Sequence, residues 1–437
     1  MPFNGRFTPP GDKSISHRLI LMSLIAGGEA FIEGLSDCED CKSSLAIYRK
    51  LGGRAETRTG EGELGVRGLA IRGLGGRWEA PGSPGSPESI ELDCGNSGTT
   101  IRLLMGILSA RPGKYLLDGD TQLRRRPMER VAEPLRLMGA KIETLNGRPP
   151  VTIWGGPLTG IDYRMNTASA QLKSAILLAG LQAAGQTSVT EPHATRDHTE
   201  RLINYFGGQI AVQELTATVA PVGLTLPKRF TTPADPSAAA FFLVAAAMIP
   251  GSRVTAQNLL LSRTRSGFLR VLDRMGAKVS LTMVADTPEP TGDVTVSHDG
   301  PLRATEITEE EIPSLIDEIP ILSLAATQAQ GRTVFRQVDE LRVKETDRLM
   351  GIRHQLGALG ARANADGDDL IIDGPTSFIL PESLDSGSDH RLAMTLAIAL
   401  KAAGADLPIL GRESIAISYP TFDADLNSLW RDDSGQA

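Results

Sequence analysis

The sequence predicts an α/β fold built from six similar units, three in each of two domains. Six apolar segments rich in small residues each run to a glycine, and a short run typical of a β-strand follows each of them. Self-similarity along a chain usually indicates a repeat architecture, and these units are long enough for each to form a small α/β layer. The glycines that mark the six units are Gly28, Gly113, Gly185, Gly251, Gly331 and Gly404.

Each unit is expected to contain a helix, a strand, a second helix and a further strand, with additional strands in some units. The first helices are strongly apolar, so we expect them to be buried on most sides and to end at the marker glycine. The second helices are amphipathic, and five of them end in the related signals KLGG, LMGA, YFGG, RMGA and ALGA. The sixth unit closes with YPTFDADLNSLW. The segments expected as first helices are residues 17–28, 99–113, 169–185, 236–251, 317–331 and 389–404.

Composition and charge exclude several classes of function. A net charge of −7 and an aromatic content of 4% argue against a general nucleic-acid binder, which needs a basic surface and stacking side chains. No apolar run reaches the roughly 18 residues that a membrane span requires. The length of 437 residues suffices for two or three domains, and two prolines interrupt the pattern near residues 229–237. We therefore expect a globular protein with a domain boundary there and no nucleic-acid or membrane partner.

The three cysteines indicate a reducing compartment rather than a disulfide framework, because their number is odd and low. Cys38 and Cys41 form a CxxC motif, which raises the possibility of a redox or zinc site. The intervening Glu39 and Asp40 disfavour thiolates, and no second CxxC or paired histidines complete a zinc site. We expect a cytoplasmic protein without a metal site.

Basic residues recur at the predicted helix starts, although the helix dipole favours acidic residues there. The stretch PGDKSISHR places Lys13 and Arg18 at one such start, and Asp12 before the lysine excludes a Walker A loop. Taken singly, each charge could be a solvated surface residue, and Asp317 or Asp389 could simply be a helix cap. The recurrence favours an arrangement in which helix N-termini from both halves point at one cleft and bind anionic groups.

Eight motifs follow one another along the chain: PGDKSISHR, GNSGTTIR, RRRPM, SAQLKSA, TRDHTE, LIDEIPIL, LRVKETDR and DHRLAM. Their order resembles that of the 5-enolpyruvylshikimate-3-phosphate synthases, and the resemblance extends from residue 9 to about residue 423. SAQLK and RDHTE are similar to the class II branch, whereas SRTR at 262–265 departs from that branch's usual Asn-x-Thr-Arg. The resemblance implies the two-domain enolpyruvyl transferase fold, with six βαβαββ units, three per domain, in an inverted arrangement. It implies a first domain at 12–232, a second at 1–11 with 233–437, a hinge near 229–237, and a cleft that closes on substrate.

The resemblance also implies a reaction. Enolpyruvyl passes from phosphoenolpyruvate to the 5-hydroxyl of shikimate 3-phosphate, and phosphate leaves, by addition and elimination through a tetrahedral intermediate. The family works without metal or organic cofactor in the pathway to chorismate and the aromatic amino acids. The expected partners are therefore these two small-molecule substrates, and we expect a monomer. Two anionic substrates require fixed cations and exclusion of water, which accounts for the charges at the helix starts.

Site residues follow from the same resemblance, position by position. Asp317 is expected to accept the 5-hydroxyl proton, Glu345 to handle the proton at the methylene carbon, and Lys13 to lie between the substrates. Ile417 stands where some family members carry a further catalytic lysine. The residues expected at shikimate 3-phosphate are Lys13, Ser14, Arg18, Ser169, Ala170, Gln171, Arg196, Asp317 and Lys344. The residues expected at phosphoenolpyruvate are Lys13, Asn96, Gly98, Arg126, Gln171, Arg348 and Arg391.

Gly98 has a further implication. Glyphosate inhibits many members of the family at the phosphoenolpyruvate site, and tolerant class II members carry alanine where this chain has Gly98. We therefore expect this protein to be inhibited by glyphosate despite its class II motifs.

Two alternatives remain at this point. One is the enolpyruvyl transferase that acts on UDP-N-acetylglucosamine, which would show a GAKN-like start and usually a reactive cysteine on a mid-domain loop. This chain has GDKS, and LDGDTQLRRRP contains no cysteine. The other is a non-enzymatic anion-binding protein on the same scaffold. The presence of Asp317 and Glu345 beside the cations argues against it, because binding of anions alone gains little from two acids.

Overall fold

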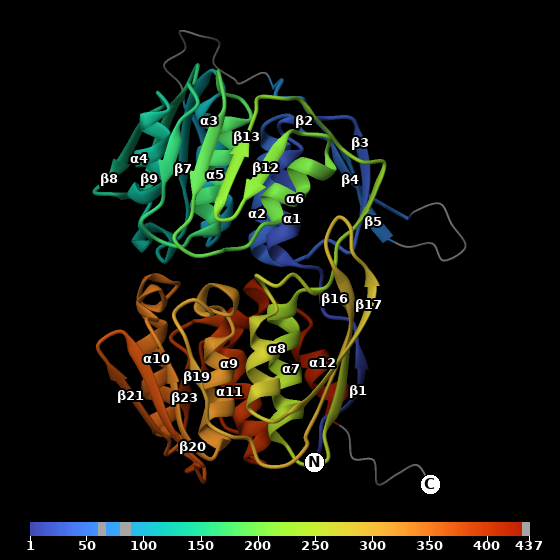
Figure 1. Cartoon of the computed structure of the whole chain (residues 1–437), viewed down its shortest axis with the longest axis vertical. Coiled ribbons are helices and arrows are strands. Elements are labelled where there is room, and N and C mark those ends of the chain that lie inside the picture. Colours follow the sequence, from blue (N-terminus) through green and yellow to red (C-terminus); the bar gives the residue numbers. More distant parts are fainter. Residues whose placement is uncertain (60–66, 79–88, 431–437) are drawn as a thin grey trace. The chain divides into compact units, whose positions relative to one another are not determined.

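The computed structural model describes residues 1–59, 67–78 and 89–430, and the chain divides into two compact units (Figure 1). Unit 1 consists of Met1–Pro10 and Pro233–Ala437, and unit 2 of Gly11–Thr232. Gly11 falls in unit 2, one residue earlier than the expected boundary. A β-carbon on Gly11 would lie 1.7 Å from the carbonyl oxygen of Gly34, so this backbone contact requires glycine. The hinge near residues 229–237 stays a prediction.

Three first helices form the interior of unit 2. Helix α3 contacts both α1 and α5, and most residues of all three are buried. The second helices are only partly buried, as their amphipathic pattern predicts. The first helices are α1 (Lys13–Met22), α3 (Gly98–Ser109) and α5 (Ala170–Gly180). The second helices are α2 (Glu39–Lys50), α4 (Glu129–Leu137) and α6 (His198–Tyr205).

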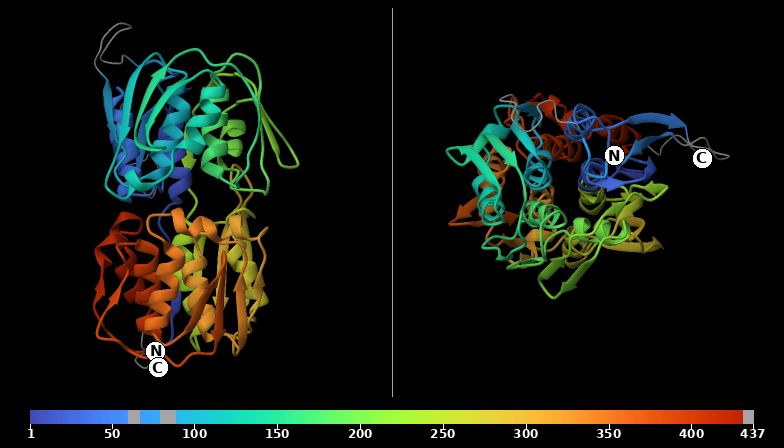
Figure 2. Two further views of the ribbon diagram at one scale, coloured as in Figure 1. Left: turned by 90° about the vertical axis from the view of Figure 1, so that its left-hand side faces the viewer. Right: turned by 90° about the horizontal axis from the view of Figure 1, so that it is seen from above.

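The sheets of unit 2 repeat one topology. In each four-stranded sheet an outer strand pairs in parallel with the strand that follows the first helix. A third strand pairs antiparallel with the other side of that strand, and the fourth strand pairs antiparallel with the third. The strands lie on the outside of the helices (Figure 2). One sheet contains β15 (Arg229–Thr231), β3 (Glu29–Glu33), β5 (Arg67–Arg72) and β4 (Ala55–Thr59). The next contains β6 (Ile90–Asp93), β7 (Gly113–Asp118), β9 (Arg148–Gly155) and β8 (Lys141–Leu145). The third contains β10 (Asp162–Arg164), β11 (Thr187–Thr190), β13 (Thr216–Val219) and β12 (Ile210–Gln213). A short pair joins β2 (Ala26–Gly27) and β14 (Leu224–Thr225).

Unit 1 has the same plan, with its first helices in mutual contact. Every residue of α7 is buried, because α9, α11 and strands β16 and β18 surround it. The first helices are α7 (Pro236–Met248), α9 (Ile319–Gln328) and α11 (His390–Ala402). The second helices are α8 (Gly267–Arg274), α10 (Arg348–Ala358) and α12 (Phe422–Leu429).

The N-terminal strand of the chain belongs to unit 1, where it pairs in parallel with β16. Its sheet contains β1 (Asn4–Phe7), β16 (Arg253–Leu260), β18 (Thr291–Ser297) and β17 (Lys278–Ala285). The second sheet contains β19 (Glu306–Ile307), β20 (Gly331–Phe335), β22 (Asp369–Gly374) and β21 (Arg362–Asp366). We call each of the six repeats predicted from the sequence a module. The sheet of the sixth module is smaller than the others: within the described residues it has only the parallel pair β23 (Leu384–Asp385) and β24 (Ile409–Leu410).

Four short helical turns and one loop lie between the strands and helices of the two units. The turns are of the 3₁₀ type: Leu123–Arg125, Ile312–Ser314, Asp339–Val343 and Arg412–Ile417. The loop consists of residues 191–197, between β11 and α6. No helix in the described ranges is long and apolar enough to cross a membrane.

The marker glycines act differently from the expectation. Only Gly404 directly follows the cap of its first helix, and the other first helices end at least three residues before the glycine. All six have positive φ, from 65° at Gly404 to 142° at Gly113, and stand where the chain turns toward the next strand. Glycine adopts such angles at little cost, so the residue marks the turn rather than the helix end. The first glycine in each of KLGG, LMGA, YFGG, RMGA and ALGA does follow its helix cap directly, with positive φ, as expected.

Candidate active site

The start of α1 in unit 2 carries the first group of predicted site residues. Asp12 caps the helix, and its carboxylate accepts a hydrogen bond from the Ile15 amide at 2.8 Å. Lys13 Nζ lies 3.0 Å from Asp40 Oδ2, on the first turn of α2. Asp12 is therefore a structural cap, and Lys13 is a half-buried cation at this helix start.

Arg18 lies one turn further along α1 and is almost completely buried. Its Nε donates to Thr199 Oγ1 at 2.7 Å, and Nη2 donates to Ser174 Oγ at 2.8 Å. A third bond, of 2.9 Å, runs from Nη1 to the Ser14 carbonyl oxygen. Arg196 Nη1 lies 3.5 Å from Ser14 Oγ. These contacts bring α1, α5 and the loop 191–197 together, as a shared phosphate site would require.

The start of α5 lies beside α3. Ser169 caps α5 through its hydroxyl, which accepts from the Leu172 amide at 3.4 Å. The Gln171 side chain receives a hydrogen bond from Arg102 and donates to Thr99 Oγ1 at 2.8 Å. Ala170 is the first residue of α5. An amide side chain and helix-start N–H groups are thereby gathered at one end of unit 2.

Gly98 is the first residue of α3, and it lies against two arginines. A β-carbon there would lie 2.6 Å from Arg126 Nη1 and 3.2 Å from Arg102 Nη1. Asn96, two residues earlier, donates to Asp120 at 2.8 Å and to Gln122 at 2.7 Å. The absence of a side chain at Gly98 therefore leaves room for the guanidinium of Arg126.

In unit 1, the carboxylate of Asp317 lies among three cations. Its Oδ1 is 3.8 Å from Lys344 Nζ and 3.6 Å from Arg348 Nη1, and its Oδ2 is 3.8 Å from Arg391 Nη2. Asp317 is not the helix cap that the sequence allowed, since α9 begins at Ile319 with Glu318 as its cap residue. Arg391 Nη1 also donates to the Asp317 carbonyl oxygen at 3.0 Å. Four of the five site residues predicted in this unit thus meet at one carboxylate.

The fifth, Glu345, reaches the same group through Arg348. Its Oε2 accepts from Arg348 Nη2 at 2.6 Å, and Arg348 Nε donates to Asp389 Oδ2 at 2.9 Å. Arg348 Nη1 is buried and has no hydrogen-bond partner in the part of the chain that the structure describes. This nitrogen has only the longer ion pair with Asp317, so it is available to an anion at this site.

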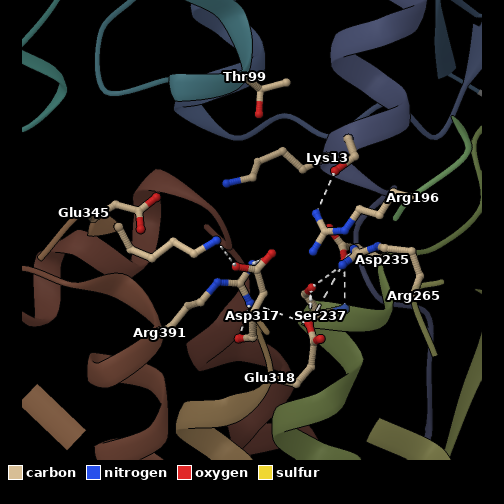
Figure 3. A network of polar contacts seen from close by, with 12 residues as sticks. Lys13, Thr99, Arg196, Asp235, Ser237, Arg265, Asp317, Glu318, Glu345 and Arg391 are labelled. Atoms are coloured by element: carbon tan, nitrogen blue, oxygen red, sulfur yellow. Dashed lines mark hydrogen bonds and ion pairs between the residues drawn. The ribbon is translucent and has the colours of Figure 1, made fainter. Parts of the chain in front are cut away.

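A second network of polar side chains lies next to Asp317 and Arg391 (Figure 3). The Ser237 hydroxyl donates to Glu318, and Arg265 donates to Ser237 Oγ at 2.9 Å and to Asp235 at 2.8 Å. Glu318 Oε1 also lies 3.9 Å from Arg391 Nη1. Asp235 caps α7, which anchors the network to a fully buried helix.

Burial and neighbouring charges shift several pKa values in these clusters. Burial lowers the pKa of Lys344; the Asp317 carboxylate opposes this effect and Arg348 adds to it. Burial alone would raise the pKa of Asp389, but the Arg348 guanidinium outweighs it and the pKa is lowered. Burial lowers the pKa of His17, beside Lys13 and Arg18, to about 3, so His17 is neutral at pH 7.

Several residues of these clusters were not predicted as site residues, and four of them are charged partners at or beside the predicted residues. Asp40 pairs with Lys13, Arg102 with Gln171, Asp389 with Arg348, and Glu318 with Arg391. Arg102 had a local signal, since it lies one helical turn after Gly98. The other three pair with residues 27 to 73 positions away, and nothing in the local sequence marks such a pairing. Among the described residues no cluster of three or more His, Cys, Asp and Glu side chains could hold a metal ion, and the three cysteines are buried free thiols.

Comparison with solved structures defines the class of protein. The enolpyruvyl transferase NikO from Streptomyces tendae is 20% identical, with a TM-score of 0.77 over 99% of this chain and 96% of that chain. At that identity the likeness shows the fold, and it defines an enolpyruvyl transferase fold. The EPSP synthase from Acinetobacter baumannii is 38% identical, with a TM-score of 0.82 over 98% of this chain and 96% of that one.

Sequence comparison narrows this class. The family model described as EPSP synthase (3-phosphoshikimate 1-carboxyvinyltransferase) matches residues 1–426. The 3-phosphoshikimate 1-carboxyvinyltransferase of Geobacillus kaustophilus is 44% identical over 429 residues, 97% of each chain. That of a Synechococcus species is 44% identical over 437 residues, covering 98% of this chain and 97% of the relative. The chain belongs to the EPSP synthase family of enolpyruvyl transferases. The resemblance drawn from the motifs is confirmed, and the UDP-N-acetylglucosamine alternative is not favoured.

Proposed function

We propose that this protein transfers the enolpyruvyl group of phosphoenolpyruvate to the 5-hydroxyl of shikimate 3-phosphate and releases inorganic phosphate. The observation that carries the proposal is the Asp317 carboxylate, which lies 3.6 to 3.8 Å from Lys344, Arg348 and Arg391. A carboxylate among cations can take a proton from a hydroxyl while the same cations hold an anionic substrate. Family membership supports the same reaction.

The chemistry divides between two acids. In the addition step, Asp317 accepts the proton of the 5-hydroxyl as its oxygen attacks C2 of phosphoenolpyruvate, and a proton is added at C3. In the elimination step, C3 loses a proton, phosphate leaves, and the enol ether double bond forms. Glu345 is the group proposed to give and take the C3 proton, and its contact with Arg348 holds it beside the phosphoenolpyruvate residues. Lys13, Arg348 and Arg391 stabilise the negative charge of the intermediate.

The two substrates are assigned to residues as follows. Unit 2 supplies to shikimate 3-phosphate the cluster of Lys13, Ser14, Arg18, Ser169, Ala170, Gln171 and Arg196, and unit 1 adds Asp317 and Lys344. Phosphoenolpyruvate is assigned to Lys13, Asn96, Gly98, Arg126, Gln171, Arg348 and Arg391. Arg348 Nη1, which has no hydrogen-bond partner among the described residues and a 3.6 Å ion pair with Asp317, supports the assignment of an anion to that group. Joining these residues into one cleft requires the two units to meet around the substrates, and this is part of the proposal.

The proposal includes a monomeric, cytoplasmic enzyme that uses neither metal nor organic cofactor. The test is a phosphate-release assay with phosphoenolpyruvate and a panel of acceptors: shikimate 3-phosphate, shikimate and UDP-N-acetylglucosamine. We expect phosphate and an enolpyruvyl product with shikimate 3-phosphate, unchanged by a chelator. Turnover with UDP-N-acetylglucosamine instead would move the protein to the other transferase. Binding of shikimate 3-phosphate without any turnover would make it an anion-binding protein. Light scattering tests the monomer.

A further inference from the structure

The loop 191–197 carries one of the proposed phosphate-binding residues, Arg196, between β11 and α6. Arg196 reaches Ser14 Oγ at 3.5 Å, at the start of α1. A long arginine on a loop can sample many positions, and each position that misses the ligand lowers affinity. Something must hold the loop if Arg196 is to meet a phosphate group reproducibly.

A buried group of charges lies directly behind this loop. Lys173, on α5, has Nζ 2.8 Å from Glu191 Oε2 and 2.5 Å from Glu200 Oε1. The three side chains are only 3% to 6% exposed. Glu191 begins the loop and Glu200 lies on the first turn of α6, so Lys173 ties both ends of the loop to α5. We call Lys173, Glu191, Glu200 and Thr195 the Lys173 network.

Glu191 also holds the middle of the loop. Its carboxylate accepts the Thr195 amide at 3.4 Å, and it accepts the Thr195 hydroxyl through its other oxygen. Thr195 is buried, and Arg196 is the next residue in the chain. The backbone amide that precedes Arg196 therefore donates a hydrogen bond to the Glu191 carboxylate, and this carboxylate forms an ion pair with Lys173.

Burying the charges of the Lys173 network costs free energy, so the presence of the network calls for a reason. Burial would lower the pKa of Lys173, but Glu200 and Glu191 outweigh it and the pKa is raised, so the lysine stays charged. A buried charge cluster is often no more stable than apolar residues of the same volume, because desolvation offsets the attraction. Hydrogen bonds and ion pairs are directional, however, so they restrict the positions of the side chains and of the loop more than apolar packing does.

We propose that Thr195, Glu191 and Lys173 are positioning residues that hold Arg196 in place for the phosphate group of shikimate 3-phosphate. The inference rests on the proposed function, and it assigns these residues no contact with either substrate. Each acts through Arg196, so its effect on shikimate 3-phosphate affinity exists only while Arg196 is present.

Thr195→Val tests the tie nearest to Arg196, because it keeps the shape of the side chain and removes only the hydroxyl. By calorimetry we expect the dissociation constant for shikimate 3-phosphate to rise about two- to tenfold, the usual worth of one such hydrogen bond. In steady-state assays kcat and the KM for phosphoenolpyruvate should change little, whereas simple damage to the fold would lower kcat. Thr195→Ser restores the hydroxyl and should restore the affinity. Thr218→Val is the matched control, since Thr218 makes a similar bond to Ser188, at 2.8 Å, on the sheet of the same module.

A double-mutant cycle with Arg196→Ala decides the inference. Thr195→Val should have no further effect on the dissociation constant in the Arg196→Ala background. The same weakening in both backgrounds, or none in the parent, would overturn the inference. If Thr195→Val fails to fold, Glu191→Gln replaces it in the same cycle, because glutamine keeps the shape and one acceptor. A parent that binds and turns over shikimate 3-phosphate keeps the proposed function intact whichever way the cycle falls, whereas a parent that never binds it refutes the proposed function instead.

Discussion

The Nε atom of Arg348 lies 2.9 Å from Oδ2 of Asp389, and the two side chains are 1% and 0% exposed. The same carboxylate caps α11, where its Oδ1 accepts the amides of Arg391 at 2.9 Å and of Leu392 at 3.2 Å. One buried acid therefore fixes both the side chain of Arg348 and the helix start that carries Arg391. These are two of the arginines assigned to phosphoenolpyruvate, so their spacing depends on Asp389.

Asp389→Asn should lower the free energy of unfolding by up to about 3–5 kcal/mol, because the buried guanidinium of Arg348 loses its most deeply buried carboxylate and keeps only Glu345 and the longer pair with Asp317. Asparagine is itself a good cap, so the loss is not that of the cap. Urea unfolding measures the change. Asp347→Asn is the matched control: Asp347 caps α10 through the Met350 amide, at 3.0 Å, but is exposed. Its loss should stay below about 1 kcal/mol. Equal losses in the two variants would contradict the role given to burial.

Arg391→Ala should weaken phosphoenolpyruvate far more than shikimate 3-phosphate, by about 2–5 kcal/mol if a desolvated charge pair is broken. Arg126→Ala and Arg348→Ala should act on the same substrate. Arg348→Ala should also destabilise the fold, since it strands Asp389 and Glu345, whereas Arg391 has longer contacts with its acids. The KM for each substrate, measured while the other substrate is saturating, separates the effect on phosphoenolpyruvate from the effect on shikimate 3-phosphate. Equal weakening of both substrates would indicate general damage to the site.

Asp317→Asn keeps the size of the side chain and removes the proposed base, so kcat should fall by about two to four orders of magnitude. Shikimate 3-phosphate should still bind, because the other residues assigned to it remain and Lys344 loses a competing carboxylate. Single-turnover assays and calorimetry measure the two quantities. Parent-like turnover in this variant would show that another group takes the proton.

Gly98→Ala should raise the inhibition constant for glyphosate more than the KM for phosphoenolpyruvate, and the parent should be inhibited. The added β-carbon would lie 2.6 Å from Arg126 Nη1, so the guanidinium that we assign to phosphoenolpyruvate must shift. The strain is about 1–3 kcal/mol in a tightly packed site, and the longer ligand should feel more of it. Measuring both constants in parent and variant decides the point. An unchanged ratio would rule out the steric explanation.

Lys344 should set an alkaline limit on binding of shikimate 3-phosphate. Burial lowers its pKa, so it loses its proton at a lower pH than an ordinary lysine, and affinity for the anion should fall as pH rises through that lowered value. In the protein without ligand, the pH dependence that Lys344 gives to the free energy of unfolding has the opposite sign to the pH dependence of the affinity. The unfolded state binds this proton more tightly, so the free energy of unfolding should rise with pH between the lowered pKa and the ordinary one. Lys344→Arg stays protonated and should move the alkaline limb of kcat/KM upward. A limb that does not move would assign it to another group.

Local signals in the sequence were enough for the modular plan. Apolar first helices, amphipathic second helices and glycines with positive φ after the second helices depend on backbone and side-chain preferences within a few residues, and these expectations are confirmed. The charged helix starts at Lys13, Arg196 and Arg391 could be found the same way. The marker glycines were misjudged, because the need for positive φ at a turn and the end of a helix produce the same local signal.

The sequence by itself thus determined the fold class, the family and the residue types that its chemistry needs, because motifs of adjacent residues carry that information. Only the tertiary structure decided how these side chains are paired. Arg348 with Asp389, Lys13 with Asp40 and Lys173 with Glu191 are separated by 41, 27 and 18 residues. The physical reason is that ion pairs and buried hydrogen bonds act over a few ångströms. Which distant residues come that close is determined by the packing of whole helices, such as α10 against α11 and α1 against α2.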